Sequence, residues 1–423
     1  MNYQTPRGTY DILPDETGRW QEAEEIIRRI TKLYHYAEIR TPYFESTSVF
    51  ARQNDSSDMV NKEMYTFGTG SDSYTLRPEG TAGVIRAFDQ HKMYGSMELP
   101  AKFYYMGPMF RHERPQKGRQ RQFTQFGVEA IGLKAPLLDA ETIALGIDVC
   151  KALGIQSIKV CINTLGDDAS REVYRNALRE YFSPHIDELC GDCHRRLEQN
   201  PLRILDCKVD ADNPLLKAAP KLTDYLNEES REYFRQVLSA LDAMGIPYEI
   251  DDRLVRGLDY YTHTVFEVQS TRPDSGAQAT IFGGGRYDHL VEYFGGPELS
   301  GIGFAIGMER LLSLAAEDGY QFHDEQKLDA YVIGLGEVGN APLTAVERLR
   351  AAGLAAEANL SRRSLKAQFR SAERTGAKYI VILGEEELKN GTLNLKRASD
   401  QTQVTIPEAA LIDQIREWEG KQI

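Results

Sequence analysis

The stretch "KFYYMGPMFRHERPQKGRQRQFTQFGVEAIG" spans residues 102–132 and places a polar loop between two strand-like segments. Both outer segments are rich in aromatic and β-branched residues, which favour strands, whereas the middle gathers charge around one Pro and one Gly. The shorter segments "AEIRTPYF", "EMYTF" and "SYTLRP" have the same strand character, with few long helices between neighbours. The pattern therefore predicts an antiparallel sheet rather than a series of βαβ units.

The loop at residues 110–123 concentrates positive charge in a chain whose formal net charge is -13. A run of charge is usually a solvated loop, and that interpretation stays open. An acidic total does not exclude a polyanionic partner, because binding depends on local patches. The loop is therefore also a candidate docking site for a polyanion. Its basic residues are Arg111, Arg114, Lys117, Arg119 and Arg121.

The bulk properties are those of a globular protein with several domains. The chain has 423 residues, of which 41% are hydrophobic and 27% charged, and this length predicts two or three domains. No run of apolar residues approaches the roughly twenty that span a membrane. The first residues, "MNYQTPRGTYDILPDE", lack the pattern of a secretory signal, so we expect a cytoplasmic protein without a membrane partner.

Three of the five cysteines, Cys190, Cys193 and Cys207, cluster in "LCGDCHRRLEQNPLRILDCK". The spelling C-x-x-C-H also occurs at c-type haem attachment sites, but the missing export signal argues against that interpretation. A zinc site with these thiols and His194 is a second alternative. We favour reduced structural cysteines, so no metal site is assigned from the sequence.

Changes between strand-rich and helix-rich sequence predict that the chain has three structural parts. Strand-rich segments at 1–167 and 249–320 form the core, and 168–248 is a mainly helical insertion. A polar linker at 315–327 leads to a small α/β domain at 328–423, in which Asn390-Gly391 is a hairpin signal. A first helix is expected after Pro14, because apolar residues then recur at helical spacing.

The segment "GIGFAIGMERLL" begins at Gly301 and alternates small and large residues. One face is therefore core, and the other is bare backbone on which a flat ring could lie, with Arg310 near the start of the following helix to meet phosphates. Close packing of helix on sheet is an equally good explanation of this segment alone. In the same way, alternation in "FTQFGVEA" puts four residues on one face: Phe123, Gln125, Gly127 and Glu129.

A rival nucleotide signal lies at 334–339, where "GLGEVG" spells G-x-G-x-x-G and Glu357 follows at a suitable distance. Too few residues follow it for a complete dinucleotide fold. The next predicted helix is also strongly basic, with Arg362, Arg363, Lys366 and Arg370. We interpret this segment as a glycine-rich turn. A shift in the melting temperature of the protein on addition of a dinucleotide would instead support a nicotinamide-dependent enzyme.

Five motifs in order carry a resemblance to a known family. "TPYFE" around Pro42, the loop at 110–123 and "GIGFAIGMERL" resemble the three signature motifs of class II aminoacyl-tRNA synthetases, while "RGLDYYTHTVFEV" and "GGGRYDHL" resemble the two signatures of histidyl-tRNA synthetases. The resemblance runs essentially end to end. It implies an α+β fold: a class II antiparallel sheet flanked by helices, a helical insertion and a small C-terminal α/β anticodon-binding domain. It also implies a homodimer formed through the first motif.

The implied reaction joins L-histidine and ATP, carried as a Mg²⁺ complex, into histidyl-adenylate and then transfers histidine to tRNA(His). By position, Arg256 and Arg111 would be catalytic, balancing charge at the α-phosphate. ATP would contact Arg111, Glu113, Arg119, Phe123, Gly303 and Arg310. Gln116 and Arg114 would face the tRNA. The histidine site would comprise Glu79, Thr81, Gln125, Glu129, Tyr260, Tyr261 and Tyr287.

The main alternative is a non-catalytic, histidine-sensing regulatory paralogue of this family that serves an ATP phosphoribosyltransferase. Such proteins usually lack the anticodon domain and lose catalytic arginines. Here Arg111, Arg256 and Arg310 are present and the C-terminal part is complete, which favours the enzyme. A site that bonds both ring nitrogens rejects apolar amino acids, so no editing domain is expected; the helical insertion is interpreted as a clamp on tRNA.

Overall fold

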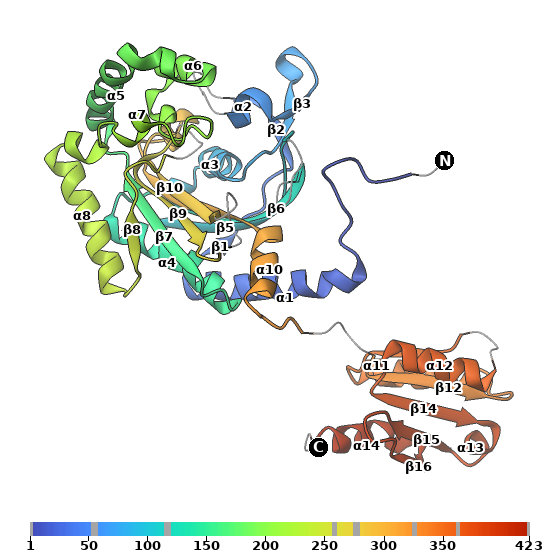
Figure 1. The fold of residues 1–423 in the computed structure, drawn as a ribbon. Coiled ribbons are helices and arrows are strands. Elements are labelled where there is room, and N and C mark those ends of the chain that lie inside the picture. Colours follow the sequence, from blue (N-terminus) through green and yellow to red (C-terminus); the bar gives the residue numbers. More distant parts are fainter. Residues whose placement is uncertain are drawn as a thin grey trace. The chain divides into compact units, whose positions relative to one another are not determined.

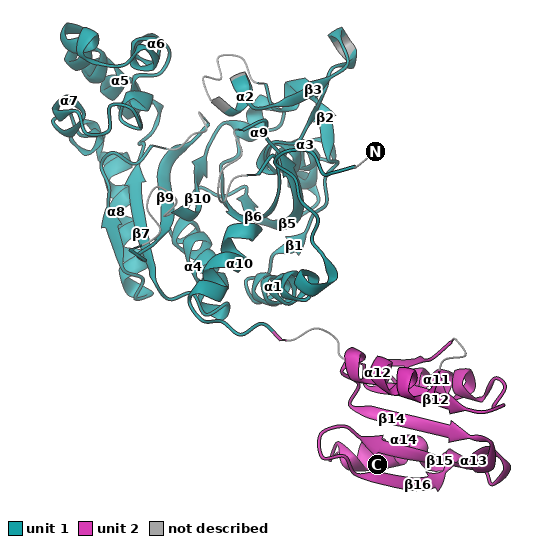
Figure 2. Ribbon diagram, turned by 45° about the vertical axis from the view of Figure 1, so that its right-hand side comes forward, with its two compact units in different colours: residues 1–322 teal, residues 323–423 magenta. Residues whose placement is uncertain are grey.

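The computed structural model describes residues 3–51, 58–113, 120–255, 260–273, 280–323, 328–360 and 364–420. The chain divides into two compact units, residues 1–322 and 323–423 (Figure 2). No helix in the described ranges is long and apolar enough to cross a membrane.

The first unit is built around one long sheet with the strand order β1-β5-β6-β11-β10-β9-β7-β8 (Figure 1). Its pairs are antiparallel except at the two edges, where β1 runs parallel to β5 and β8 parallel to β7. The antiparallel sheet predicted from the sequence is thus confirmed. Its strands are β1 (Ala37–Glu38), β5 (Ala101–Phe110), β6 (Gln122–Ile131), β7 (Ile158–Thr164), β8 (Tyr248–Ile250), β9 (Thr262–Ser270), β10 (Thr280–Tyr287) and β11 (Gly301–Gly307).

A three-stranded sheet, in the order β2-β4-β3, accompanies the long one. Its strands are β2 (Phe44–Ser46), β3 (Tyr65–Phe67) and β4 (Tyr74–Leu76). The helices of the first unit are α1 (Pro14–Leu33), α2 (Asp58–Lys62), α3 (Thr81–Gln90), α4 (Pro136–Ala152), α5 (Asp168–Phe182), α6 (Gly191–Gln199), α7 (Pro214–Lys217), α8 (Glu228–Ala243), α9 (Leu290–Tyr293) and α10 (Met308–Glu317).

One face of the long sheet forms the main hydrophobic core. The large residues of β11, Ile302, Phe304 and Ile306, are buried there with α1, α4, α8 and α10. This confirms the predicted alternation in "GIGFAIG". Helix α4 is buried over most of its surface and needs no polar face, since it lies between the sheet and its neighbouring helices. The opposite face carries a second hydrophobic cluster, in which α3 and α9 pack against large residues of β5, and it is lined by small residues at β11.

The helices of the predicted insertion, residues 168–248, pack against two different parts of the first unit. Helices α5, α6 and α7 share their own hydrophobic cluster, which rests on the sheet through Cys161 and Val265, and they group together in both views (Figures 1 and 2). Helix α8 instead packs against α4 and contributes Tyr233, Phe234 and Val237 to the main core. By packing, α8 belongs with the core of the unit.

The second unit is a five-stranded sheet in the order β13-β12-β14-β15-β16, with parallel pairing among the first three strands and antiparallel pairing among the last three. Helices α11 and α14 cover one face and α12 the other. The elements are β12 (Ala330–Leu335), α11 (Ala341–Ala351), β13 (Ala356–Ala358), α12 (Leu365–Thr375), β14 (Tyr379–Gly384), α13 (Glu385–Lys389), β15 (Thr392–Arg397), β16 (Gln403–Pro407) and α14 (Leu411–Trp418).

Two local predictions were wrong. Asn390-Gly391 is not a hairpin turn: it ends the short helix α13, with Gly391 at φ 66°, because a glycine with positive φ suits a helix C-terminus as well as a turn. The linker predicted from residue 315 begins later, since α10 continues to Glu317. Tyr320 then packs against the main core and donates a hydrogen bond of 2.8 Å to Glu22.

Candidate active site

The sheet face opposite the main core is lined by small residues where three strands meet. Register places Gly303 of β11 between Glu129 of β6 and Gly285 of β10, and Ala305 beside Gly127. A Cβ atom on Gly303 would lie 2.1 Å from the Glu129 carboxylate. The glycine is therefore needed to seat that carboxylate. The predicted shared face of Gln125, Gly127 and Glu129 is confirmed by the same register.

Glu129 is the chemical centre of this face. Its carboxylate is buried and accepts hydrogen bonds from Thr81 Oγ1 at 2.6 Å and Tyr287 Oη at 2.7 Å. It makes no ion pair with a described residue, and burial raises its pKa to about 8. A carboxyl group held this way can exchange hydrogen bonds with a polar ring that carries N–H groups.

Aromatic rings form one wall beside Glu129. The ring of Tyr260 lies 4.8 Å from that of Tyr261 and 5.9 Å from that of Tyr287. Tyr287 also covers Gly301, since a Cβ there would lie 2.3 Å from its ring. The bare face expected over the whole of β11 is thus covered near Gly301 and Gly303, and it stays open only toward Gly307, where a Cβ would meet nothing within 4 Å.

Glu79 lies at the other side of the pocket, at the start of α3. Its buried carboxylate accepts hydrogen bonds from the backbone N–H groups of Thr81, at 2.6 Å, and Ala82, at 2.9 Å. These contacts satisfy donors that a helix N-terminus leaves unpaired. Thr81 is the link between the two acids, because its backbone binds Glu79 while its side chain binds Glu129.

Two polar atoms mark the open end of the sheet face. Gln125 lies opposite Gly307, and its Oε1 is buried without a hydrogen-bond partner among the described residues. Arg310, in the first turn of α10, has a buried Nε that likewise lacks one. Burial also lowers the pKa of Arg310. Buried polar atoms normally have partners, so both are consistent with a ligand at this end.

Arg111 follows β5 directly and connects the strand to the Glu79 segment. Its Nε donates a hydrogen bond of 2.9 Å to the carbonyl of Pro78, and its guanidinium lies 5.3 Å from the ring centre of Phe123. Glu113 Oε1 is 3.9 Å from Arg111 Nη1. The guanidinium is thus held between the two strands of the hairpin and the start of α3, with Phe123 and Glu113 beside it.

Four predicted site residues, Arg256, Arg119, Arg114 and Gln116, lie outside the described residues. Arg111 and Arg310 both lie in the first unit. The convergence of these two residues with Arg256 stays a prediction. The described site residues lie on β6, β10, β11, α3 and α10, just before α3 and β9, or just after β5.

Two features of the site were missed by the sequence reasoning. The ring of Tyr105 lies against Gly80 and Gly127, where Cβ atoms would come within 2.2 and 2.3 Å of it. The only hint in the sequence that a ring packs here is Gly80, the glycine next to Thr81. Glu309, next to Arg310, accepts a hydrogen bond of 2.8 Å from the backbone N–H of Thr124, and burial raises its pKa to about 7. This contact ties the start of α10 to β6.

Arg286, in the "GGGRYDHL" motif, points to the core side of the sheet and is fully buried. Its guanidinium is paired with Asp139 of α4 and donates a hydrogen bond of 3.1 Å to the carbonyl of Leu133. Asp139 also accepts a hydrogen bond of 2.6 Å from Thr264. The motif thus puts a structural arginine behind the pocket and Tyr287 inside it.

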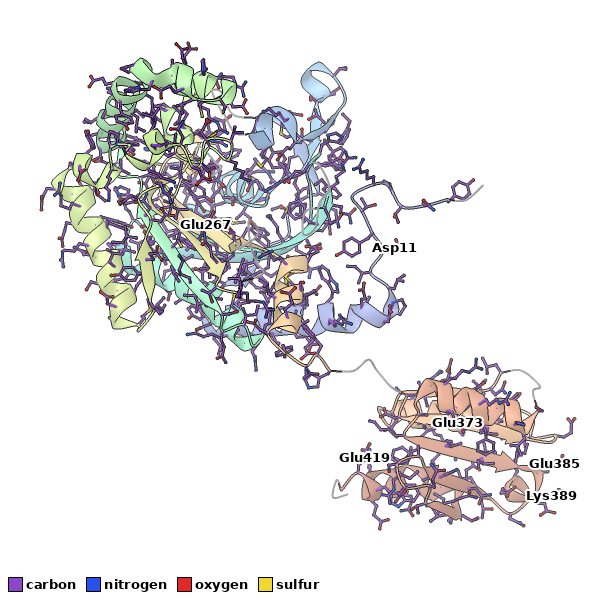
Figure 3. All side chains as sticks on the ribbon, viewed as in Figure 1. Asp11, Glu267, Glu373, Glu385, Lys389 and Glu419 are labelled. Carbon is purple, nitrogen blue, oxygen red and sulfur yellow. The ribbon has the colours of Figure 1, made fainter. Side chains whose placement is uncertain are left out.

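The glycine-rich turn of the second unit does not form an anion site. Glu385, labelled in Figure 3, accepts a hydrogen bond of 2.8 Å from the backbone N–H of Glu337 and lies where a Cβ on Gly336 would be. A carboxylate therefore occupies the place that a pyrophosphate would take in a dinucleotide fold, and it would repel one. This arrangement supports the interpretation of "GLGEVG" as a turn.

The fold and site are those of a class II aminoacyl-tRNA synthetase. They combine an antiparallel sheet that has small residues on one face with Arg111 at the end of β5 and Arg310 at the start of α10, which follows β11. A family model described as histidyl-tRNA synthetase matches residues 8–311, and one described as an anticodon binding domain matches residues 329–418. The chain belongs to the histidyl-tRNA synthetase family.

Individual relatives agree along nearly the whole length. The histidine–tRNA ligase of Lysinibacillus sphaericus (strain C3-41) is 51% identical over 418 residues, covering 98% of this chain and 99% of that protein. That of Bacillus subtilis (strain 168) is 50% identical over 409 residues, covering 96% of both. The crystal structure of apo histidyl-tRNA synthetase from S. aureus is similar with a TM-score of 0.84 at 42% identity, covering 98% of this chain and 100% of that one.

Proposed function

We propose that this protein activates L-histidine with ATP to give histidyl-adenylate and pyrophosphate, and then transfers the histidine to tRNA(His). The observation that carries the substrate choice is Glu129, a buried carboxyl group that is hydrogen-bonded by Thr81 and Tyr287. An imidazole ring supplies N–H groups to this acceptor. An apolar side chain would supply no donor to its remaining acceptor positions, which can cost a factor of roughly 10⁴–10⁵ in specificity.

Histidine would lie on the small-residue face, with its ring against Tyr261 and Tyr287 and near Glu129. Its ammonium group would be received by Glu79, Thr81 and Gln125. The unpartnered Oε1 of Gln125 supports this orientation, because an ammonium N–H is the donor it lacks. The carboxylate would then point toward Arg111.

ATP, carrying Mg²⁺ on its phosphates, would lie at the open end of the sheet between Arg111 and Arg310, beside Phe123 and Glu113 and toward Gly307 rather than over the predicted Gly303, which Glu129 covers. Adenylate formation needs no covalent intermediate with the enzyme. It needs alignment of the carboxylate with the α-phosphate and donors for the charge that develops there. We assign this stabilisation to Arg111 and Arg256, and the grip on the far phosphates to Arg310 and Arg119.

The tRNA would contact both units. Gln116 and Arg114 would face the acceptor end, and the anticodon would meet residues 328–423. A surface hollow of about 570 Å³ on α12, lined by Ala367, Arg370, Glu373 and Arg374, supports a contact there (Glu373 is labelled in Figure 3), because arginines pair well with phosphates. Within the predicted insertion at 168–248, we assign α5, α6 and α7 to a clamp on tRNA, while α8 packs with the catalytic core at 1–167 and 249–320.

A homodimer formed through the first motif is also proposed. Tyr43, Phe44 and Phe67 each leave about half of their surface exposed, and the ring of Phe44 lies 6.0 Å from that of Phe67. An exposed aromatic cluster of this kind is typical of a protein interface. Sedimentation equilibrium of the purified chain measures the assembly. A cytoplasmic location is proposed because ATP and tRNA are available there.

The test of function is ATP–pyrophosphate exchange with each of the twenty amino acids in turn. Exchange that depends on histidine alone is expected. Removal of one preorganised donor by Arg256→Ala should slow exchange about 10²–10³-fold without altering the circular dichroism spectrum. Absence of exchange with every amino acid would instead favour the histidine-sensing regulator, which the relatives named as ligases over nearly their full length do not favour.

A further inference from the structure

Three thiols and one carboxylate converge at one point between α6 and the segment that follows it. The Cys190 sulfur lies 3.7 Å from that of Cys193 and 3.6 Å from that of Cys207. Asp210 Oδ2 lies 3.2 Å from Cys193 Sγ and 3.4 Å from Cys207 Sγ. All four ligand atoms lie within 4.8 Å of one another. None of the five cysteines is in a disulfide.

These separations match the edges of a tetrahedron around one small metal ion. With a Zn–S bond of about 2.3 Å and a Zn–O bond of about 2.0–2.2 Å, tetrahedral geometry puts two sulfurs roughly 3.8 Å apart, and a sulfur roughly 3.5 Å from an oxygen. The cluster already has these spacings, so a metal would bind with little movement of the chain.

We propose that Cys190, Cys193, Cys207 and Asp210 bind a structural Zn²⁺ ion. Soft thiolate ligands in tetrahedral arrangement select zinc over the hard cations Mg²⁺ and Ca²⁺. The four protein ligands leave no open position for a substrate, which is the mark of a structural rather than a catalytic zinc. The fourth ligand is Asp210 and not His194, because His194 is exposed and lies outside the cluster.

Local structure prepares the site for a cation. Cys190 is the N-cap of α6 and Cys193 lies in its first turn, so both sulfurs lie at the N-terminal end of this helix. The backbone N–H of Cys190 also donates a hydrogen bond of 3.0 Å to Asp210.

The ion would join two segments of the cluster formed by α5, α6 and α7. Cys193 and Cys207 are buried in its small hydrophobic core, together with Leu202 and Ile204. A small core often needs an added link to hold a single arrangement. The zinc would connect the start of α6 to residues 207–210 and fix the shape of this part of the molecule.

The test is the metal content of the full chain, purified from zinc-containing medium and dialysed against metal-free buffer. Inductively coupled plasma mass spectrometry of the dialysed protein should find about one zinc ion per chain. Cys190→Ser and Asp210→Asn should each lose most of that zinc, whereas Cys150→Ala, a buried cysteine of α4 far from the cluster in sequence, should retain it. Circular dichroism verifies that each variant is folded.

Cobalt substitution gives a second readout that does not depend on the variants. The Co²⁺ form of the unmodified chain should show the thiolate charge-transfer band and the strong visible bands of tetrahedral cobalt. The proposal is overturned if the unmodified chain neither carries zinc nor takes up Co²⁺ with these bands. It is also overturned if folded Cys190→Ser and Asp210→Asn retain as much zinc as Cys150→Ala.

Discussion

The two faces of the long sheet each bury a carboxyl group, and they treat it in opposite ways. On the core side, Asp139 is paired with Arg286 and bonded by Thr264, so its charge is balanced within the chain. On the pocket side, the donors to Glu129 among the described residues are hydroxyl groups, and burial raises its pKa to about 8. A buried carboxylate that is paired with a cation supports the fold, whereas a buried carboxyl group without a cation, which burial keeps largely protonated, is available to a ligand.

The largest expected effect comes from breaking the balanced pair. Arg286→Met leaves Asp139 buried without its cation and should lower the free energy of unfolding by about 3–5 kcal/mol. Urea unfolding measures it. The double variant Arg286→Met/Asp139→Asn removes the stranded charge and should recover part of the loss. If the single variant were as stable as the unmodified chain, the structural role of the pair would be wrong.

The pocket side predicts a pH dependence of stability. Since the pKa of Glu129 is about 8 in the folded protein and 4.5 unfolded, the folded state binds more protons between these values. The contribution of Glu129 to stability should therefore be largest below pH 4.5 and fall as pH rises toward 8, by at most about 1.4 kcal/mol per pH unit. Glu309, with a pKa of about 7, contributes in the same direction over a narrower window.

Urea unfolding at pH 5 to 9 measures this slope. In a Trp418→Phe background the remaining tryptophan, Trp20, reports the first unit alone. Glu129→Gln should flatten the curve up to pH 8, and Glu309→Gln only up to pH 7. Equal slopes in the unmodified and Glu129→Gln proteins would show that Glu129 does not titrate as described.

A smaller effect is expected from Tyr287→Phe, which removes one hydrogen bond to Glu129 and keeps the ring that packs against Gly301. The loss of one such bond costs about 1 kcal/mol, so the Kd for histidine should rise by less than about tenfold. Isothermal titration calorimetry measures it. Phe282 on the same strand faces the main core, and Phe282→Leu should leave the Kd unchanged.

Much of the fold could be predicted from local pattern. Period-two alternation correctly assigned the two faces of β6 and β11, because β11 buries its large residues on one side and the alternating residues Phe126, Val128 and Ala130 of β6 are buried on that same side. Packing between distant segments could not be predicted in this way. Helix α8 lies in the expected insertion but packs on α4, and nothing in its own sequence distinguishes α4 from α5 as a partner.

The site shows the same limit. Sequence pattern and resemblance supplied Glu129, Thr81 and Tyr287, but not the hydrogen bonds that join them, since 48 residues separate the first two and 158 separate Glu129 from Tyr287. Asp210 was missed as a partner of the three thiols because its position depends on the turn after Cys207. Glu309 was missed because an acid in a first helical turn is common and carries no signal by itself.

The most direct test of the account is histidine-dependent pyrophosphate exchange by Glu129→Gln. The substitution keeps the size of the side chain and removes the carboxyl group that can ionise when it pairs with a bound imidazole. The account predicts that kcat/KM for histidine falls by about 10–150-fold, equivalent to the roughly 1.5–3 kcal/mol of a charged hydrogen bond, with no loss of stability. A kcat/KM within about twofold of the unmodified protein would contradict it.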